Sequence, residues 1–320
     1  MNTQLLQVRN LRVEFGRHAA VRDVSFDVFS GETVGLVGES GSGKSTLARA
    51  LLRLLQPASG SVEFSGLDLL KSPPKVMRAQ RRELQIVFQE PLASLNPRMT
   101  VGDAIAERLL IFEPELSPAA RRGKVAAILE RVGLSAAIAS RYPHEFSGGQ
   151  CQRIGIARAT VLRPKLLVCD EAVSSLDVSI QGQIINLLLD LQQDMGMAML
   201  FISHNLAVVR NLSHRVLVMY LGRLVEVASC ETLFAAPVHP YTRALLAAVP
   251  RIPPVVELPE SAPLAEGSLA ASSIAHGCAF RDRCPYVLPL CESSDPPLLE
   301  IAAGHMVACH RSHETLNPLS

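Results

Sequence analysis

At residues 38–45 the chain reads Gly38-Glu39-Ser40-Gly41-Ser42-Gly43-Lys44-Ser45. An apolar run at 33–37 precedes this stretch, and a helical pattern at 45–55 follows it. A glycine-rich loop between a strand and a helix turns its backbone N–H groups toward phosphate oxygens. We therefore expect Lys44 to reach the β- and γ-phosphates of a nucleotide and the Ser45 hydroxyl to hold Mg²⁺. The alternative, a glycine-rich turn that precedes Lys44 by coincidence, would arise in about one such chain in a hundred.

The composition bounds the class of protein. Of the 320 residues 48% are hydrophobic, which is enough to form a core and excludes a mainly disordered chain. The chain has 31 Lys and Arg residues and 30 Asp and Glu residues, which gives a net charge of +1. It therefore lacks the excess of positive charge that is typical of a dedicated nucleic-acid-binding protein. No apolar stretch is long enough to span a membrane, and the N-terminus does not resemble a signal peptide. We therefore expect a cytosolic protein.

Strand and helix patterns alternate along the chain. Apolar runs predict further strands at 11–15, 24–28, 166–169 and 197–202. Apolar residues at helical spacing predict helices at 101–112, 119–132, 151–159 and 180–191. This order predicts an α/β fold with a mainly parallel sheet, an N-terminal hairpin and a helical insertion between residues 90 and 160. Prolines mark a linker after residue 250, at Pro250, Pro253, Pro254, Pro259 and Pro263.

A carboxylate is needed near the phosphate loop to hold Mg²⁺. Asp170 emerges at the C-terminal end of the predicted strand at 166–169, and Glu171 follows it, placed to polarise an attacking water. Taken alone, this pair is equally consistent with a solvated strand end. Together with the phosphate loop, it favours a magnesium ligand and a general base.

A second helix start suited to an anion lies at Ser147-Gly148-Gly149-Gln150. The simpler interpretation is that Ser147 caps the helix that follows. However, one nucleotide does not need two such loops in one domain. The other interpretation is therefore a clamp on the phosphates of a nucleotide carried by a second copy of the domain.

Four of the seven cysteines crowd the C-terminal segment, at Cys278, Cys284, Cys291 and Cys309. In a cytosolic protein such a cluster favours a metal site over a disulfide framework. The intervals between the four match neither zinc ribbons nor ferredoxins. The spacing therefore shows only that four thiolates could converge, and a mixed site with His276, His305 or His310 stays open.

These stretches together resemble the nucleotide-binding subunits of ABC transporters, in particular the ATPase subunits of oligopeptide and dipeptide permeases. Besides the loop at 38–45, the resemblance rests on Val87-Phe88-Gln89-Glu90-Pro91, Ser94-Leu95-Asn96-Pro97-Arg98, Ser147 to Arg153, Asp170-Glu171, Ser175-Leu176-Asp177, His204 and His239-Pro240-Tyr241-Thr242. It implies a P-loop NTPase (RecA-like) core with an antiparallel β subdomain and a helical ABC subdomain at about 90–160. The nucleotide-binding domain would cover residues 1–250, and a cysteine-rich extension would cover residues 251–320.

The resemblance also implies roles for single residues. Phe15 would stack on adenine, with a buried strand residue as the alternative, and Thr46 would join residues 38–45 in binding ATP. Gln89 would contact Mg²⁺ and the attacking water, and His204 would reach the γ-phosphate. Asp177 would shape a dimer interface, and Ser147 to Gln150 would bind the partner's ATP.

The segment from Cys278 to Pro285 resembles the part of peptide-permease ATPases that holds a [4Fe–4S] cluster. The resemblance therefore implies such a cluster on Cys278, Cys284, Cys291 and Cys309. A zinc ion and free buried thiols remain the alternatives.

Partners follow from the same resemblance. We expect a second, related ATPase subunit, two membrane subunits and a periplasmic peptide-binding protein, with the chain on the cytoplasmic face of the inner membrane and no nucleic acid bound. An importer of nickel or another small solute is one alternative function. A soluble ABC ATPase acting on nucleic acid or ribosomes is another, and so is a redox sensor built on the cysteine segment.

Overall fold

The computed structural model describes residues 3–248 and 276–314. The described residues form two compact units, the first made of residues 3–7, 27–33 and 63–203, and the second of residues 8–26, 34–62, 204–248 and 276–314. The expected linker with Pro250, Pro253, Pro254, Pro259 and Pro263 lies outside the described residues. The expected domain division at residue 250 therefore stays a prediction.

Three parallel strands form the sheet of the first unit: β6 (Leu84–Val87), β7 (Leu166–Asp170) and β8 (Ala198–Ser203). β7 lies in the middle and pairs with both neighbours. All side chains of β7 and β8 are buried, as is typical of parallel strands covered on both faces. The predicted strands at 166–169 and 197–202 are confirmed. Because the strands are parallel, Val87 and Asp170 end them at the same edge.

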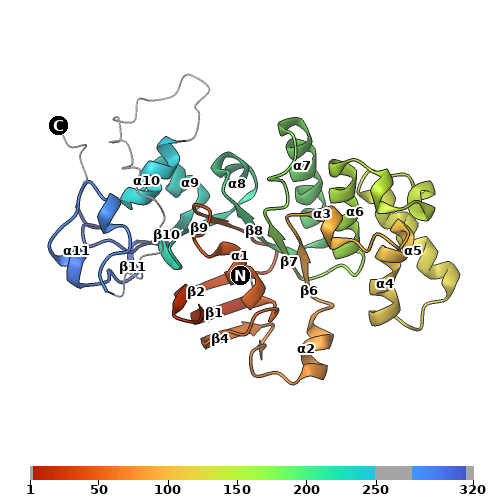
Figure 1. The fold of residues 1–320 in the computed structure, drawn as a ribbon, viewed down its shortest axis with the longest axis horizontal. Coiled ribbons are helices and arrows are strands. Elements are labelled where there is room, and N and C mark those ends of the chain that lie inside the picture. Colours follow the sequence, from red (N-terminus) through yellow and green to blue (C-terminus); the bar gives the residue numbers. More distant parts are fainter. Residues whose placement is uncertain (1–2, 249–275, 315–320) are drawn as a thin grey trace. The chain divides into compact units, whose positions relative to one another are not determined.

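Helices fill the stretch of the first unit between β6 and β7, where the insertion at about 90–160 was expected (Figure 1). Within it, α4 packs on α5 and α6, and α3 packs on α6. The helix predicted at 101–112 has those bounds in α4. The helical elements of this unit are α2 (Pro74–Gln80), α3 (Pro91–Ser94), α4 (Val101–Phe112), α5 (Pro118–Arg131), η1 (Ala136–Ser140), η2 (Pro143–Glu145), α6 (Gly148–Thr160) and α7 (Val178–Met195).

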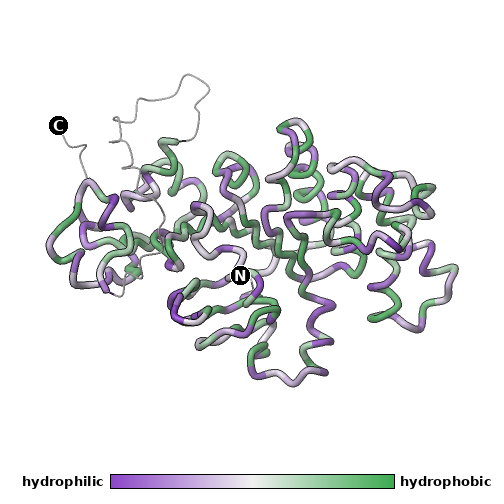
Figure 2. Tube along the Cα trace, viewed as in Figure 1, coloured by the Kyte–Doolittle hydropathy of each residue, from purple (hydrophilic) through white to green (hydrophobic). Residues whose placement is uncertain are grey.

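The sheet of the second unit has the strand order β11-β12-β10-β9-β3. Its strands are β3 (Thr33–Val37), β9 (Arg215–Tyr220), β10 (Arg223–Ser229), β11 (Leu299–Ala302) and β12 (His305–Val307). β3 pairs with β9 in parallel, whereas the β9–β10, β10–β12 and β12–β11 pairs are antiparallel. The middle strands are mostly apolar and buried, and they form a green band in Figure 2. The helical elements are α1 (Lys44–Leu51), α8 (Leu206–Leu212), α9 (Cys230–Ala235), α10 (Pro240–Ala247), η3 (Arg281–Arg283) and α11 (Leu290–Ser293).

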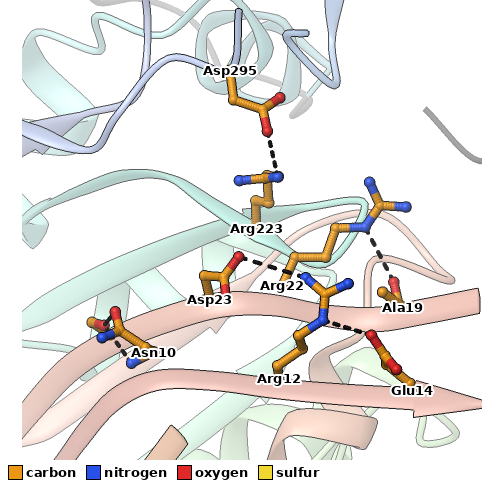
Figure 3. A network of polar contacts seen from close by, with 9 residues as sticks. Asn10, Arg12, Glu14, Ala19, Arg22, Asp23, Arg223 and Asp295 are labelled. Atoms are coloured by element: carbon orange, nitrogen blue, oxygen red, sulfur yellow. Dashed lines mark hydrogen bonds and ion pairs between the residues drawn. The ribbon is translucent and has the colours of Figure 1, made fainter. Parts of the chain in front are cut away.

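The C-terminal segment from residue 276 to residue 314, which we call the extension, is part of this second sheet. Its strand β12 pairs with β10, in register Glu226↔Val307. An ion pair of 2.6 Å between Arg223 and Asp295 adds a second connection beside the ladder (Figure 3). The extension is therefore built into the second unit.

A separate four-stranded sheet has the order β2-β1-β4-β5. It consists of β1 (Gln4–Phe15), β2 (His18–Phe29), β4 (Ser59–Phe64) and β5 (Leu67–Asp68). A two-residue turn with φ of +60° at Gly16 joins β1 to β2, so the predicted N-terminal hairpin is confirmed. Both strands are longer than the predicted runs at 11–15 and 24–28. In the added part of each strand, polar residues lie between buried apolar residues, so the apolar run alone does not show the full length.

One predicted helix ends earlier than its apolar pattern suggests. The pattern continues to residue 55, but α1 ends at Leu51. Arg53 takes a left-handed conformation with φ of +52°, and the N–H of Leu54 returns to the carbonyl of Arg49. This is a Schellman closure, in which the left-handed position is usually glycine. The absence of glycine there is why the sequence does not reveal the stop.

Candidate active site

The phosphate loop at residues 38–45 joins β3 to the N-terminus of α1 in the second unit. Gly38 and Gly43 have positive φ angles of +154° and +102°. A Cβ at Gly38 would lie 2.1 Å from the carbonyl oxygen of Met219, and one at Gly43 would lie 2.3 Å from that of Ala20. Both positions therefore require glycine because neighbouring backbone approaches the loop closely.

Lys44 lies folded back over this loop. Its Nζ donates hydrogen bonds to the carbonyl oxygens of Gly38 and Glu39, each at 2.8 Å, and to the Oγ of Ser42 at 3.3 Å. The residue is buried, with 4% exposure. A cation held at the start of α1, where the helix dipole is also positive, is the arrangement that favours a phosphate group. Ser45 and Thr46 follow on the first turn of α1 and are half-buried.

Phe15 ends β1 with 52% of its surface exposed. The alternative that it is an ordinary buried strand residue is therefore wrong. An exposed ring can offer its face to a planar partner. Its adenine-stacking role stays a prediction.

In the first unit the structure brings Gln89 and Glu171 together. The Nε2 of Gln89 donates a hydrogen bond of 3.0 Å to an Oε of Glu171. The register explains the contact: Val87 pairs with Cys169, and each of the two side chains comes two residues later. Asp170, the last residue of β7, is buried with 3% exposure. Carboxylate and amide oxygens thus gather at the edge where the strands end.

The backbone at Glu171 is strained, since its φ is +49° in a residue that is not glycine. Its carbonyl oxygen accepts a hydrogen bond of 3.0 Å from the Ser174 hydroxyl, which holds the turn. Strain of this kind is concentrated at functional sites. His204, directly after β8, and Asp177, the N-cap of α7, are both exposed.

The stretch Ser147 to Gln150 begins α6 with a capping box. The Ser147 hydroxyl accepts the N–H of Gln150, and the Gln150 side chain accepts the N–H of Ser147. The capping interpretation is confirmed. Ser147, Gly148 and Gln150 are nevertheless exposed, so the start of this 13-residue helix faces outward. Capping therefore does not conflict with the expected clamp on a partner's nucleotide, which stays a prediction.

The four cysteines of the extension line one small cavity of about 10 Å³, together with Phe280 and His310. Burial raises the pKa of the Cys278 thiol to about 11, and it also raises the pKa values of Cys284 and Cys309. All seven cysteines lie in the described residues, and none forms a disulfide.

Of the three histidines considered for a mixed site, two bond to other groups and one is exposed. His305 pairs with the buried Glu226 at 2.8 Å, and His310 bonds the carbonyl oxygen of Ser294 at 2.9 Å. His276 is exposed. Across residues 3–248 and 276–314, no three His, Cys, Asp or Glu side chains lie close enough together to hold a metal ion. The expected metal centre on the cysteines is therefore unsupported by the arrangement of the side chains.

Two family models match the chain: ABC transporter over residues 21–174, and oligopeptide/dipeptide transporter, C-terminal region, over residues 225–291. The oligopeptide transport ATP-binding protein OppF of Haemophilus influenzae is 50% identical over 291 residues, which cover 91% of this chain and 88% of that protein. OppF of Escherichia coli is 48% identical over 319 residues and 95% of both chains. This chain belongs to the ABC transporter ATP-binding proteins.

Solved ABC proteins have the same fold. CbiO1 from Clostridium perfringens, part of the ABC transporter complex cbiONQ, superposes with a TM-score of 0.67 at 26% identity, over 73% of this chain and 92% of that one. A dimeric ATP-binding cassette in a post-hydrolysis state with ADP and phosphate superposes with a TM-score of 0.65 at 25% identity, over 71% of this chain and 99% of that one. The α/β P-loop fold is therefore confirmed.

Membership in this family makes the chain an ATP-binding and ATP-hydrolysing transporter subunit. The roles of single residues in binding and hydrolysis stay predictions. None of the helices in the described part of this ABC protein is long and apolar enough to cross a membrane.

From the sequence, two residues that contact the phosphate loop were assigned no role there. The hydroxyl of Tyr241 accepts the N–H of Glu39 at 2.8 Å, and Arg283 forms an ion pair with the Glu39 carboxylate. Tyr241 belongs to the His239 to Thr242 motif that marks the peptide-permease branch, so a signal for it was present. Arg283 had no signal beyond its place between two cysteines.

Proposed function

We propose that this ABC ATPase energises the uptake of oligopeptides across the inner membrane. Its relatives in Haemophilus influenzae and Escherichia coli are named oligopeptide transport ATP-binding proteins, and they match it along nearly its full length. The match of residues 225–291 to the oligopeptide/dipeptide transporter C-terminal region supports the same substrate class.

In the proposed mechanism Lys44 binds the β- and γ-phosphates, helped by the backbone of residues 38–46, and Phe15 stacks on adenine. Ser45, Gln89 and Asp170 would hold Mg²⁺ through oxygen atoms, the ligand type this hard cation prefers. A bound Mg²⁺ would offset the charge that develops on the transferred phosphate. The hydroxyl of Ser45, the amide of Gln89 and the carboxylate of Asp170 are suitable ligands for this ion.

Glu171 accepts the proton of the attacking water, Gln89 orients that water, and His204 contacts the γ-phosphate. The observation that carries this mechanism is the hydrogen bond between Gln89 and Glu171 at 3.0 Å. Two side chains bonded directly at this distance leave no room for a water between them, but a water beside the pair can contact both, with Glu171 as the general base. The strained turn at Glu171 holds the base in place.

The proposed partners are a second, related ATPase subunit, two membrane subunits and a periplasmic peptide-binding protein. Ser147 to Gln150 bind the ATP held by the partner ATPase, and Asp177 lies in the interface between the two. Such an assembly places the chain on the cytoplasmic face of the membrane. The exposed start of α6 supports the clamp, since it is open to a ligand from outside the chain.

For the extension we propose a [4Fe–4S] cluster on Cys278, Cys284, Cys291 and Cys309, with zinc as the alternative. Support comes from the donor set: cysteine thiolates are the ligands of such clusters, and these four thiols line one cavity. The side chains must move toward a common centre on binding, because no three of them are grouped for an ion in the described residues. No step of hydrolysis involves this group.

Transport by the purified complex tests the function. The ATPase with its membrane subunits is placed in proteoliposomes, and uptake of a labelled oligopeptide is measured with the loaded peptide-binding protein outside. We expect ATP-dependent uptake and ATP hydrolysis stimulated by the loaded binding protein. Uptake of nickel instead of peptide would favour the other importer class. ATP hydrolysis stimulated by RNA or ribosomes, without uptake, would favour the soluble class.

A further inference from the structure

The extension contacts the phosphate loop through a paired charge. Arg283, the last residue of η3, donates two hydrogen bonds to the carboxylate of Glu39, from Nη1 at 2.8 Å and from Nη2 at 3.0 Å. The two residues lie 244 positions apart in the sequence. Both side chains are largely shielded, with 13% and 23% exposure. This fork-to-fork geometry is the strongest and most directional form of an ion pair in proteins.

Aromatic rings hold the guanidinium of Arg283 in place. Its central carbon lies 5.8 Å from the ring centre of Phe280 and 5.9 Å from that of Tyr220. Tyr220, Tyr241 and Phe280 pack on one another with centroids 4.5–5.5 Å apart. Because Tyr241 also accepts the N–H of Glu39, the same cluster fixes both the backbone and the side chain of this loop residue.

Glu39 is an unusual neighbour for a polyanion. It is the second residue of the phosphate loop, and its carbonyl oxygen accepts a hydrogen bond from the Nζ of Lys44 at 2.8 Å. A carboxylate in such a loop repels nucleotide phosphates unless a cation compensates it. Arg283 supplies that cation from outside the loop.

We propose that Arg283 is a positioning residue for nucleotide binding, which neutralises Glu39 and fixes the conformation of the loop that receives the phosphates of ATP. This inference rests on the proposal that the loop of Lys44 is the ATP site. It assigns to the extension a function at that site, carried by an arginine that is not a metal ligand.

The test is a double-mutant cycle on ATP hydrolysis by the assembled transporter. The cycle comprises the unchanged complex, Arg283→Met, Glu39→Gln and the double variant. We expect Arg283→Met to raise KM for ATP about tenfold or more, as for losing one partner of a shielded charge pair, with a smaller change in kcat. Glu39→Gln removes the repelling charge together with the need for its partner. The double variant should therefore have a lower KM than Arg283→Met alone.

Two further variants separate positioning from a general structural role. Arg281→Met removes a guanidinium from the same short helix, one that bonds the carbonyl oxygen of His276 within the extension, and KM should stay near that of the unchanged complex. Arg283→Lys keeps the charge but loses the fork, so its KM should lie between those of the unchanged complex and Arg283→Met.

The inference is overturned if Arg283→Met lowers kcat and leaves KM unchanged, or if Glu39→Gln does not restore KM in the double variant. If Arg283→Met fails to assemble, the comparison of Arg283→Lys with and without Glu39→Gln decides in the same way. Lys44→Ala identifies the site itself. If Lys44→Ala leaves KM for ATP unchanged, the proposed ATP site is rejected. If Lys44→Ala raises KM but Arg283→Met does not, only the role of Arg283 is rejected.

Discussion

Two glycines of the phosphate loop differ in what surrounds them, although the sequence pattern treats them alike. Gly43 has a φ of +102°, and a Cβ there would lie 2.3 Å from the carbonyl oxygen of Ala20. Gly41 has a φ of +80°, but nothing lies within 4 Å of the corresponding position. A side chain at Gly41 meets only the backbone strain, while one at Gly43 must also displace neighbouring backbone.

Replacing these glycines should therefore have unequal effects. We expect Gly43→Ala to lose ATP binding by at least about tenfold, and to lower the melting temperature, because the loop must shift away from Ala20. Gly41→Ala is the matched control, and its losses in ATP affinity and in melting temperature should both be much smaller. ATP titration and thermal melting of the full chain measure the two effects. Equal losses in both variants would contradict the close approach at Gly43.

Glu171 is the proposed general base of hydrolysis. Glu171→Gln should retain ATP binding while turnover by the assembled complex falls about 10²-fold or more, the cost of losing a general base. The substituted amide keeps the size of the side chain and a partner for Gln89, so the fold should be unaffected. Steady-state ATP hydrolysis measures the loss of turnover, and a nucleotide-binding assay measures the retained ATP binding. Turnover near that of the unchanged complex would remove Glu171 from this role.

Among the elements, those whose bounds depend on local chemistry were predictable. The bounds of α4 follow from its apolar spacing and from Thr100, whose hydroxyl accepts the N–H of Asp103 and caps the helix. β7 and β8 follow from continuous apolar runs. The early end of α1 at Arg53 was not predictable, because a residue other than glycine takes the left-handed position.

Contacts between distant elements were predictable only through a known family. The meeting of Gln89 and Glu171 depends on the register of β6 against β7, which a single sequence does not fix. The pair Arg283–Glu39 depends on where the extension docks, 244 residues away from the loop in sequence. Resemblance supplied the first contact in outline and gave no indication of the second.

At the start of α6, Ser147 caps the helix, and we propose that it also binds the partner's phosphates. Asn and Asp cap helices about as well as Ser, so Ser147→Asn and Ser147→Asp should melt like the unchanged chain. In the assembled complex Ser147→Asp would place a negative charge against the partner's ATP. We expect its hydrolysis to fall about tenfold below that of Ser147→Asn, as for like charges brought together. Equal activity of the two variants would show that this helix start does not bind phosphate.

For the whole molecule, the cysteines of the extension decide whether its fold depends on a metal. If a [4Fe–4S] cluster is present, anaerobically purified protein should be brown and contain about four irons per chain. Replacing Cys278, Cys284, Cys291 or Cys309 by Ser should lower the iron content and expose the extension to protease. Cys230→Ser, a partly exposed thiol outside the cavity, is the control and should change neither.

The metal analysis separates the alternatives. Colourless protein with one zinc per chain would reject the cluster and keep the four cysteines as ligands. Four thiols that react with a thiol reagent, in protein without metal under the same anaerobic handling, would reject both.

The pairing of β12 with β10 has a consequence for how the chain is made. Glu226 on β10 and His305, which bonds it from β12, are 79 residues apart, so a ribosome adding about 5–20 residues per second needs about 4–16 s between them. During that interval one side of β10 has no strand beside it. An apolar strand with an open side is a template for pairing with another chain. Because β12 is synthesised after this interval, its arrival closes the side of β10 at which two nascent copies would otherwise aggregate.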